Sequence, residues 1–338
     1  IIYKTGITPK PYRKMLSSLR KCIGVLETKM SAQEWDSIEF DKIPSLAGLK
    51  YTKAFSTREE TKDRYAEFMN NKNTKVNAAV INPVSIAAKI FGRWHNALYS
   101  PEERNAICKY WDNLEDYYNG REENAIAVVD VSGSMYGTPL EAAVGMGAYI
   151  AEKSHGPFAN CFITFSQHPQ LVKFEGRDIV EKMRNCIEAD WGMNTNIEAV
   201  MDLLLDAATM SNMSQDDLPA RLYIFSDMQF DMAFDCVVDW SEDYQGKPYE
   251  TLFESIEKKW AKAGYKMPKI IFWNLDARND NCIPAIGDNF NYISGFSMSQ
   301  MEAVMAGLDA RQMMLQVLEG DRYKQVSTAG TSLDAHQE

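Results

Sequence analysis

The sequence predicts an α/β protein in which an α-helical domain precedes a doubly wound, mostly parallel sheet. Up to Gly120 the apolar residues recur at helical spacing, whereas the rest of the chain alternates short apolar runs with helical patterns. Strands that alternate with helices form parallel sheets covered on both faces. A chain of 338 residues is long enough for two domains of roughly 150 residues each. We therefore expect a basic helical domain over residues 1–120, a sheet domain over 121–324 and a flexible tail over 325–338.

The first domain is expected to contain several helices. Residues 11–29 place apolar side chains on one helical face, and residues 56–70 and 83–95 show further helical patterns. Two Ser-x-x-Glu sequences, at residues 31–34 and 100–103, have the form of a capping box, in which the serine and glutamate side chains bind free amides at a helix start. Each of them therefore predicts the start of a helix.

The second domain is expected to contain the sheet. Short apolar runs predict strands at residues 125–129, 161–165, 170–174, 222–225, 269–273 and 292–294. Helical patterns are found at residues 139–153, 179–187, 196–209, 249–264 and 299–308. Ligands of such sheets bind at the carboxyl ends of the strands. Polar residues at these ends are therefore the candidates for a functional site.

Composition and motifs exclude several classes of protein. A content of 45% hydrophobic and 25% charged residues is typical of a folded protein rather than a disordered one. No window reaches the roughly 18 apolar residues of a membrane span and no signal peptide opens the chain, so we expect an intracellular, cytoplasmic protein without a membrane partner. The six cysteines include no Cys-x-x-Cys pair, which argues against a structural zinc and favours free thiols. Gly-rich phosphate-binding loops do not occur either, so we expect no nucleotide cofactor.

The two halves of the chain differ in charge. Residues 1–121 contain 20 Lys and Arg against 14 Asp and Glu, whereas the remaining residues contain 16 against 33. A basic surface attracts phosphate backbones and an acidic one repels them. The basic residues near one another on the first helix are candidates for RNA binding: Arg13, Lys14, Arg20 and Lys21. The alternative is that they are ordinary solvent-exposed charges.

Oxygen-bearing side chains follow the predicted strands. Asp130, Ser132 and Ser134 come directly after the first strand and alternate along the chain, so their oxygens point to one side. Thr195 lies in a loop before a helix, and Asp227 follows the fourth strand. Five oxygen ligands that include two carboxylates suit a hard divalent cation, Mg²⁺ or Mn²⁺. We therefore expect these five residues to form a metal site with one position left for a partner.

This pattern resembles the von Willebrand factor A (vWA) domains, whose metal-ion-dependent adhesion site (MIDAS) is Asp-x-Ser-x-Ser with a later threonine and aspartate. The resemblance extends over residues 122–310. It implies a vWA, Rossmann-like fold in which a protein partner offers an Asp or Glu oxygen to the cation. Because the sequence places no general base near the predicted cation, we expect a non-enzymatic scaffold or assembly component; a metal-dependent hydrolase is the other alternative. The alternative is that Asp130 and Ser132 only cap a helix and hold no metal.

Two phrases, Asp130 to Met135 and Phe225 to Asp231, are similar to the Ro autoantigen (TROVE) group and its plant and viral relatives. That resemblance implies an intracellular protein, in some relatives within a virus-related setting, whose ring of helical repeats binds structured RNA. Residues 1–120 supply only about three helix pairs at roughly 40 residues per repeat, too few to close a ring. The Ro-like alternative is therefore an RNA-binding ribonucleoprotein component that uses the basic helical domain.

Overall fold

The computed structural model describes residues 6–92, 99–118, 120–165, 168–188, 196–227, 252–276, 290–295, 297–308 and 310–320. The chain divides into two compact units. The first comprises residues 1–115, 136–149 and 172–191, and the second comprises residues 116–135, 150–171 and 192–338. The first unit therefore combines the N-terminal helices with two later segments of the chain.

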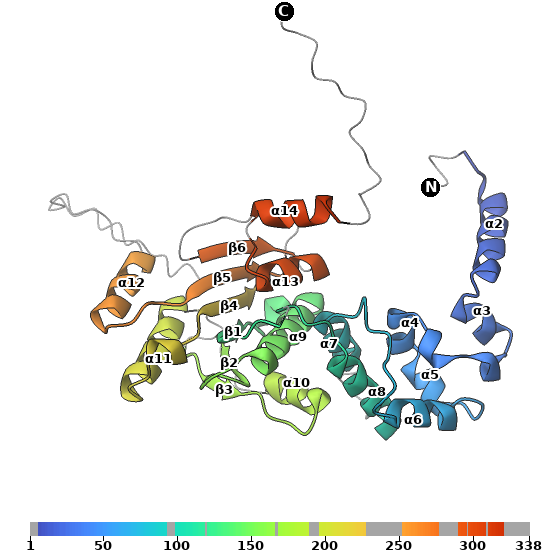
Figure 1. Cartoon of the computed structure of the whole chain (residues 1–338), viewed down its shortest axis with the longest axis horizontal. Helices are drawn as coiled ribbons and strands as arrows, with labels where there is room; N and C mark the ends of the chain where they lie inside the picture. The colour runs from blue at the N-terminus through green and yellow to red at the C-terminus, as the bar shows by residue number, and fades with distance from the viewer. Residues whose placement is uncertain are drawn as a thin grey trace, which may run out of the picture. The chain divides into compact units, whose positions relative to one another are not determined.

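The first unit is helical. Its N-terminal part contains α2 (Pro9–Cys22), α3 (Leu26–Ser31), α4 (Ser45–Lys50), α5 (Thr52–Thr57), α6 (Lys62–Asn70), α7 (Pro83–Phe91) and α8 (Pro101–Asp112). Most of α9 (Thr138–Lys153) and all of α10 (Ile179–Glu188) also belong to this unit. In Figure 1 the colour of each helix gives its place along the chain, from blue for α2 to green for α9 and α10.

The helix predicted over residues 11–29 is two helices. Gly24 lies between α2 and α3 with a φ of 63°, a left-handed conformation that glycine adopts without strain and that ends a helix. The helix start predicted at residues 31–34 is wrong. Ser31 is the last residue of α3, and the left-handed backbone of Gln33, with a φ of 61°, turns the chain before a single 3-10 turn at Trp35–Ser37.

The second predicted capping box is confirmed at the start of α8. The backbone N–H of Glu103 donates to Ser100 Oγ at 3.2 Å, and the backbone N–H of Ser100 donates to Glu103 Oε2 at 3.3 Å. The helix predicted over residues 56–70 instead forms as α5 and α6, with a break at residues 58–61. The predicted start of α7 at Pro83 is confirmed, and residues 93–95 of that prediction lie outside the described residues.

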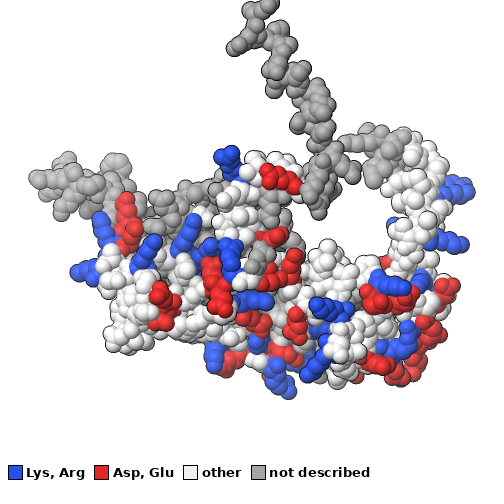
Figure 2. All heavy atoms as spheres, viewed as in Figure 1, with Lys and Arg blue, Asp and Glu red and all other residues white. Residues whose placement is uncertain are grey.

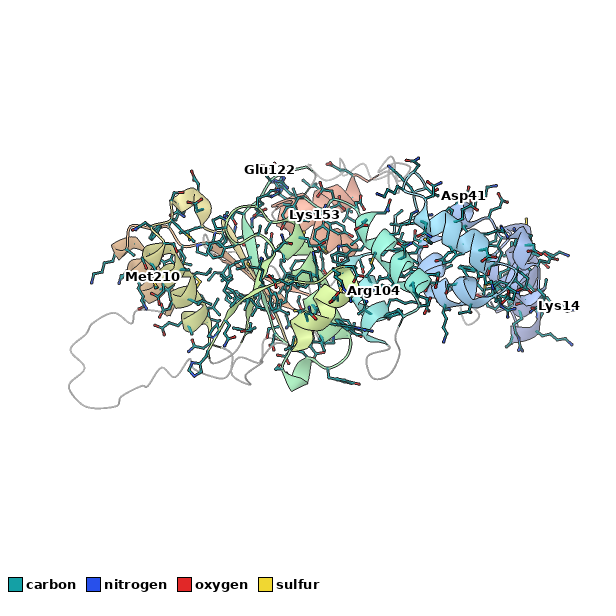
Figure 3. The ribbon with its side chains drawn as sticks, turned by 90° about the horizontal axis from the view of Figure 1, so that it is seen from below. Lys14, Asp41, Arg104, Glu122, Lys153 and Met210 are labelled. Carbon is teal, nitrogen blue, oxygen red and sulfur yellow. The ribbon has the colours of Figure 1, made fainter. Side chains whose placement is uncertain are left out.

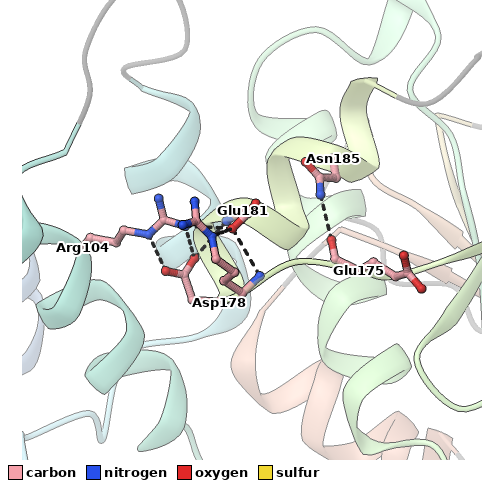
Figure 4. Close-up of polar contacts among 6 residues, drawn as sticks. Arg104, Glu175, Asp178, Glu181 and Asn185 are labelled. Atoms are coloured by element: carbon pink, nitrogen blue, oxygen red, sulfur yellow. Dashed lines mark hydrogen bonds and ion pairs between the residues drawn. The ribbon is translucent and has the colours of Figure 1, made fainter.

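Two close contacts hold the later segments within the first unit. Gly145 of α9 approaches α7 so closely that an added Cβ would lie 2.7 Å from the carbonyl oxygen of Pro83. Arg104 of α8 forms an ion pair with Asp178 and donates from Nη2 to Asp178 Oδ1 at 2.8 Å, just before α10 (Figure 4). Its Nη2 also lies 3.3 Å from Glu181 Oε2 in the first turn of α10. The first unit thus depends on contacts between segments that are distant in sequence.

A six-stranded sheet is the main feature of the second unit, which contains five of its strands and the first residue of the edge strand β3. Its strands, in the order β3-β2-β1-β4-β5-β6 (Figure 1), are β1 (Ala125–Val129), β2 (Cys161–Thr164), β3 (Leu171–Lys173), β4 (Arg221–Ser226), β5 (Lys269–Asn274) and β6 (Phe290–Ser294). The pairs β1–β2, β1–β4, β4–β5 and β5–β6 are parallel. This confirms the predicted α/β fold class, and each predicted strand overlaps an observed one.

The core of the second unit lies against one face of the sheet. The helices α11 (Ile197–Met210) and α12 (Leu252–Lys262) supply apolar side chains such as Leu204 and Trp260, which pack with Ile126, Val128 and Ile224 of the central strands. All five residues of β1 are buried, as expected for a strand covered on both faces. The unit also contains α13 (Met298–Met305) and α14 (Ala310–Leu318), the second of which the sequence did not predict.

Candidate metal site

The candidate site lies where the strand order of the sheet reverses. From β1 the chain continues to β2 on one side, whereas β4, the other neighbour of β1, leads to β5 on the opposite side. The carboxyl ends of β1 and β4 therefore flank the switch point, where ligands of doubly wound sheets bind. Asp130 follows β1 directly, and Ser226 and Asp227 stand at the end of β4. The fold brings Asp130 and Ser226 together although they are 96 positions apart in the chain.

Asp130 is anchored to both strands. Its backbone N–H donates to the carbonyl oxygen of Phe225 in β4 at 3.0 Å. The side-chain hydroxyl of Ser226 donates to Asp130 Oδ2 at 2.7 Å, and the backbone N–H of Ser132 donates to Asp130 Oδ1 at 2.8 Å. Both carboxylate oxygens are thus fixed by hydrogen bonds, and the side chain is only 1% exposed. The orientation of this carboxylate is therefore set before any ligand arrives.

The electrostatics of Asp130 favour a cation. Burial raises its pKa, because a carboxylate loses hydration inside the protein, and the nearby charge of Asp227 raises it further. The hydrogen bonds from Ser132 and Ser226 act in the opposite direction and stabilise the charged form. Asp227 is itself only 7% exposed. Two buried carboxylates that repel each other are relieved by a positive ion between them.

Ser132 and Ser134 bring two hydroxyl oxygens together. Their Oγ atoms lie 3.0 Å apart and share a hydrogen bond. Octahedral Mg²⁺ with bonds of about 2.05 Å places adjacent ligand oxygens about 2.9 Å apart. The hydroxyl pair therefore has the spacing of two neighbouring Mg²⁺ ligands. The turn is tight because the backbone N–H of Met135 donates to the carbonyl oxygen of Ser132 at 3.0 Å.

The structure brings together four of the five predicted ligands at one end of β1 and β4: Asp130, Ser132, Ser134 and Asp227. Thr195 lies outside the described residues. The sequence prediction missed Ser226, whose only signal was a hydroxyl directly before Asp227 at a strand end. Across the described part of the chain, no group of three or more His, Cys, Asp or Glu side chains is arranged so that it could hold a metal ion. A metal here would rest on carboxylates and hydroxyls, which are ligands of Mg²⁺ rather than Zn²⁺.

The predicted RNA-binding residues lie elsewhere, in the first unit. All four are exposed on α2: Arg13, Lys14, Arg20 and Lys21. Lys14 is labelled on α2 in Figure 3. The structure thus places these charges on one short helix, and it places no acidic residue among them.

The second part of the chain matches the model of a known protein family. A family model for a domain of unknown function, DUF7788, matches residues 124–335. The chain belongs to the DUF7788 family. A second model, for the domain of unknown function DUF2828, matches residues 5–127. The two matches overlap at residues 124–127, where β1 begins.

A viral protein is a curated relative of this DUF7788 member. The uncharacterized protein L728 of Acanthamoeba polyphaga mimivirus is 32% identical over 334 residues, which covers 93% of this chain and 55% of the relative. The chain therefore spans about half the length of that relative. The predicted existence of viral relatives is confirmed.

Among solved structures, the chain is similar to the Ro (RSR) protein of Deinococcus radiodurans, with a TM-score of 0.46, 14% identity, and coverage of 78% of this chain and 53% of that chain. It is also similar to proximal thread matrix protein 1 of the mussel byssus, with a TM-score of 0.31, 12% identity, and coverage of 55% of this chain and 47% of that chain. In the part of the chain that the structure describes, no helix is both long and apolar enough to cross a membrane.

Proposed function

We propose that this protein is a non-enzymatic, divalent-cation-dependent interaction protein that binds a carboxylate of a macromolecular partner at the β1–β4 strand ends. Asp130, Ser132, Ser134 and Asp227 would hold Mg²⁺ or Mn²⁺, with Thr195 as the fifth ligand. When bound, the cation supplies a positive charge to which an Asp or Glu oxygen of the partner adds. The protein would act in this way as a scaffold or assembly component.

One observation supports this proposal above all others. Two buried carboxylates, Asp130 and Asp227, share the switch point of the sheet with a pair of hydroxyl oxygens 3.0 Å apart. Burying two carboxylates near each other costs free energy, because each loses hydration and their charges repel. The hydroxyl pair is not needed for packing, because Ser134 is exposed. A metal site explains why both features occur at one place.

The chain's own residues prepare this site. Ser226 and the backbone of Ser132 hold the carboxylate of Asp130 in one orientation, so that little conformational entropy is lost when a ligand binds. Their hydrogen bonds also keep the charged form of Asp130 accessible despite its burial. The Ser132–Ser134 hydrogen bond holds the two hydroxyls side by side.

The metal is tested first, without a partner. Thermal unfolding of the full chain is followed in EDTA and at increasing MgCl₂ or MnCl₂. At a metal concentration of about 100 times Kd, binding stabilises a protein by about 2.7 kcal/mol. We expect this stabilisation in the wild-type protein and in Asp206→Asn, a matched control that removes an exposed carboxylate from α11. We expect none in Asp130→Asn. Equal stabilisation of all three proteins would refute the site.

The partner is tested separately. A protein captured by the wild type in Mg²⁺ is expected to dissociate in EDTA and to be lost with Asp130→Ala. Binding that persists in EDTA and in Asp130→Ala would refute carboxylate recognition even if the metal binds.

A second candidate function is RNA binding by the first unit. The observation in its favour is that α2 carries exposed basic residues and no acidic ones. RNA binding of this kind would weaken steeply with salt, survive Asp130→Ala and disappear when Arg13 and Arg20 are changed to Glu. An RNA affinity that does not depend on salt or on these two residues would exclude it.

A further inference from the structure

The helix α2 leaves an apolar stripe uncovered. Met15, Leu19 and Ile23 follow one another at intervals of four residues and are 43%, 51% and 73% exposed. Tyr12 and Leu16 lie on the same side, because residues three and four apart share a helical face. Although every residue of α2 is described, none of its 14 residues is buried in the structure. The stripe therefore runs the length of the helix without a covering element in the described chain.

The opposite side of α2 is basic. Its charged residues are Lys10, Arg13, Lys14, Arg20 and Lys21. The first acidic residue of the whole chain is Glu27, beyond the end of the helix. At 100° per residue, Arg13 and Arg20 border the apolar stripe on one side. Figure 2 shows Lys and Arg side chains projecting from α2 into solvent on the face in view. A locally basic surface therefore lies beside a locally apolar one.

A helix of this length needs a packing partner. Isolated helices shorter than about 12–15 residues are marginal in water, and most helices are stabilised by burying an apolar face. The described chain provides no such burial for α2, whose N-cap Thr8 also makes no side-chain capping bond. The partner of α2 must accept an apolar stripe and a row of positive charges at the same time.

We propose that α2 binds the surface of an anionic lipid bilayer, with Met15, Leu19 and Ile23 in the acyl boundary and the basic residues among the headgroups. A bilayer surface places negative charge directly above an apolar layer, which matches the two sides of this helix. RNA would neutralise the basic side but leave the apolar stripe in water. This is a peripheral contact rather than a membrane span, and it revises the expectation that the protein has no membrane partner.

The test is flotation of the full chain with vesicles of phosphatidylcholine that contain about 30% phosphatidylserine, compared with vesicles of phosphatidylcholine alone. We expect binding to the anionic vesicles and weak binding to the neutral ones. Leu19→Glu should abolish flotation. Arg13→Glu with Arg20→Glu should weaken it at least about 25-fold, because each basic residue near such a surface contributes about fivefold.

Matched controls carry the same changes elsewhere on the first unit. Val80→Glu alters an apolar side chain of similar exposure, and Lys72→Glu with Lys75→Glu reverses two exposed charges. Both controls should float like the wild type. None of the substituted α2 residues is buried, so circular dichroism should show the native fold in all variants.

Three results would overturn the proposal. The first is that the wild type does not bind the anionic vesicles. The second is that Leu19→Glu binds them as well as the wild type, which would leave the apolar stripe without a part in binding. The third is that an RNA or an acidic protein binds α2 more tightly than the anionic vesicles do, so that it displaces the protein from them when added as a competitor.

Discussion

Ser226 should control both the stability and the metal affinity of the candidate site. Its hydroxyl donates to Asp130 Oδ2 at 2.7 Å, and both residues are buried at the end of the sheet. Ser226→Ala removes the donor without creating a sizeable cavity, because alanine differs from serine only by the hydroxyl. The variant leaves one oxygen of a buried carboxylate without this bond. Hydrogen bonds to charged groups contribute about 1.5–3 kcal/mol, so we expect the free energy of unfolding to fall by that amount at neutral pH.

The loss should depend on pH. Burial raises the pKa of Asp130 above its usual value, and the hydrogen bond from Ser226 opposes this shift by favouring the charged form. The bond therefore stabilises the folded protein most when Asp130 is ionised, above its folded-state pKa. As the pH falls through that value, Asp130 takes up a proton and the difference between wild type and Ser226→Ala shrinks. The full difference in the free energy of unfolding between wild type and Ser226→Ala is therefore expected at high pH, and most of it should disappear in acid.

The assay is urea unfolding in EDTA, from pH 8 down to the lowest pH at which both proteins remain folded. Ser154→Ala is the matched control, because Ser154 is also buried and its hydroxyl bonds to the uncharged backbone of Ala125 at the opposite end of β1. The control should lose stability equally at every pH. In MgCl₂, Ser226→Ala should also bind metal about 10–100-fold more weakly, whereas Ser154→Ala should bind normally.

Two outcomes would refute this reasoning. Equal, pH-independent losses in both variants would show that Asp130 does not depend on Ser226 for its charge. An unchanged metal affinity in Ser226→Ala would show that the orientation of Asp130 is not set by this hydrogen bond.

Three further predictions concern the first unit. Arg104→Met should lower the free energy of unfolding by about 1–3 kcal/mol at neutral pH. Burial raises the pKa of Asp178, but the hydrogen bonds and charge of Arg104 outweigh burial and hold this pKa below its usual value. The loss of stability should therefore fade as acid protonates Asp178, and urea unfolding at two pH values measures this change. Gly145→Ala should destabilise the protein by about 1–3 kcal/mol, because its Cβ would lie 2.7 Å from the backbone oxygen of Pro83, and thermal unfolding measures this. Ser100→Ala should lower stability by about 0.5–2 kcal/mol through loss of the capping box, as read from urea unfolding.

The predictions for Arg104 and Gly145 each have a control in the same chain. Lys42→Met breaks an exposed ion pair with Glu39 and should leave the free energy of unfolding almost unchanged, because solvent screens such a pair. Gly133→Ala adds a Cβ with no atom within 4 Å and should be tolerated. If either control were as damaging as its test variant, the contacts named for Arg104 or Gly145 would not be the cause.

The sheet could be predicted because its strands are continuous apolar runs, and β1 is the clearest case. The position of Asp130 at the carboxyl end of the sheet could be predicted for the same reason, since it follows β1 directly. Short helices could not be predicted, because α4 has only six residues and periodicity needs about three turns to show. The Arg104–Asp178 pair could not be predicted either, because the two residues are 74 positions apart and share no local pattern. Ser226 was missed because a serine that ends a strand looks the same whether or not it donates to a carboxylate.

The contacts of Gly145 with Pro83 and of Asp178 with Arg104 have a practical consequence for cutting the chain. A nick near Gly120 would separate the peptide that carries α7 and α8 from the peptide that carries α9 and α10. These helices pack within one compact unit, so the two fragments should stay associated after the backbone is broken. When the two fragments are co-expressed as separate peptides, they should associate into one folded complex. Either fragment alone would expose apolar surface and aggregate.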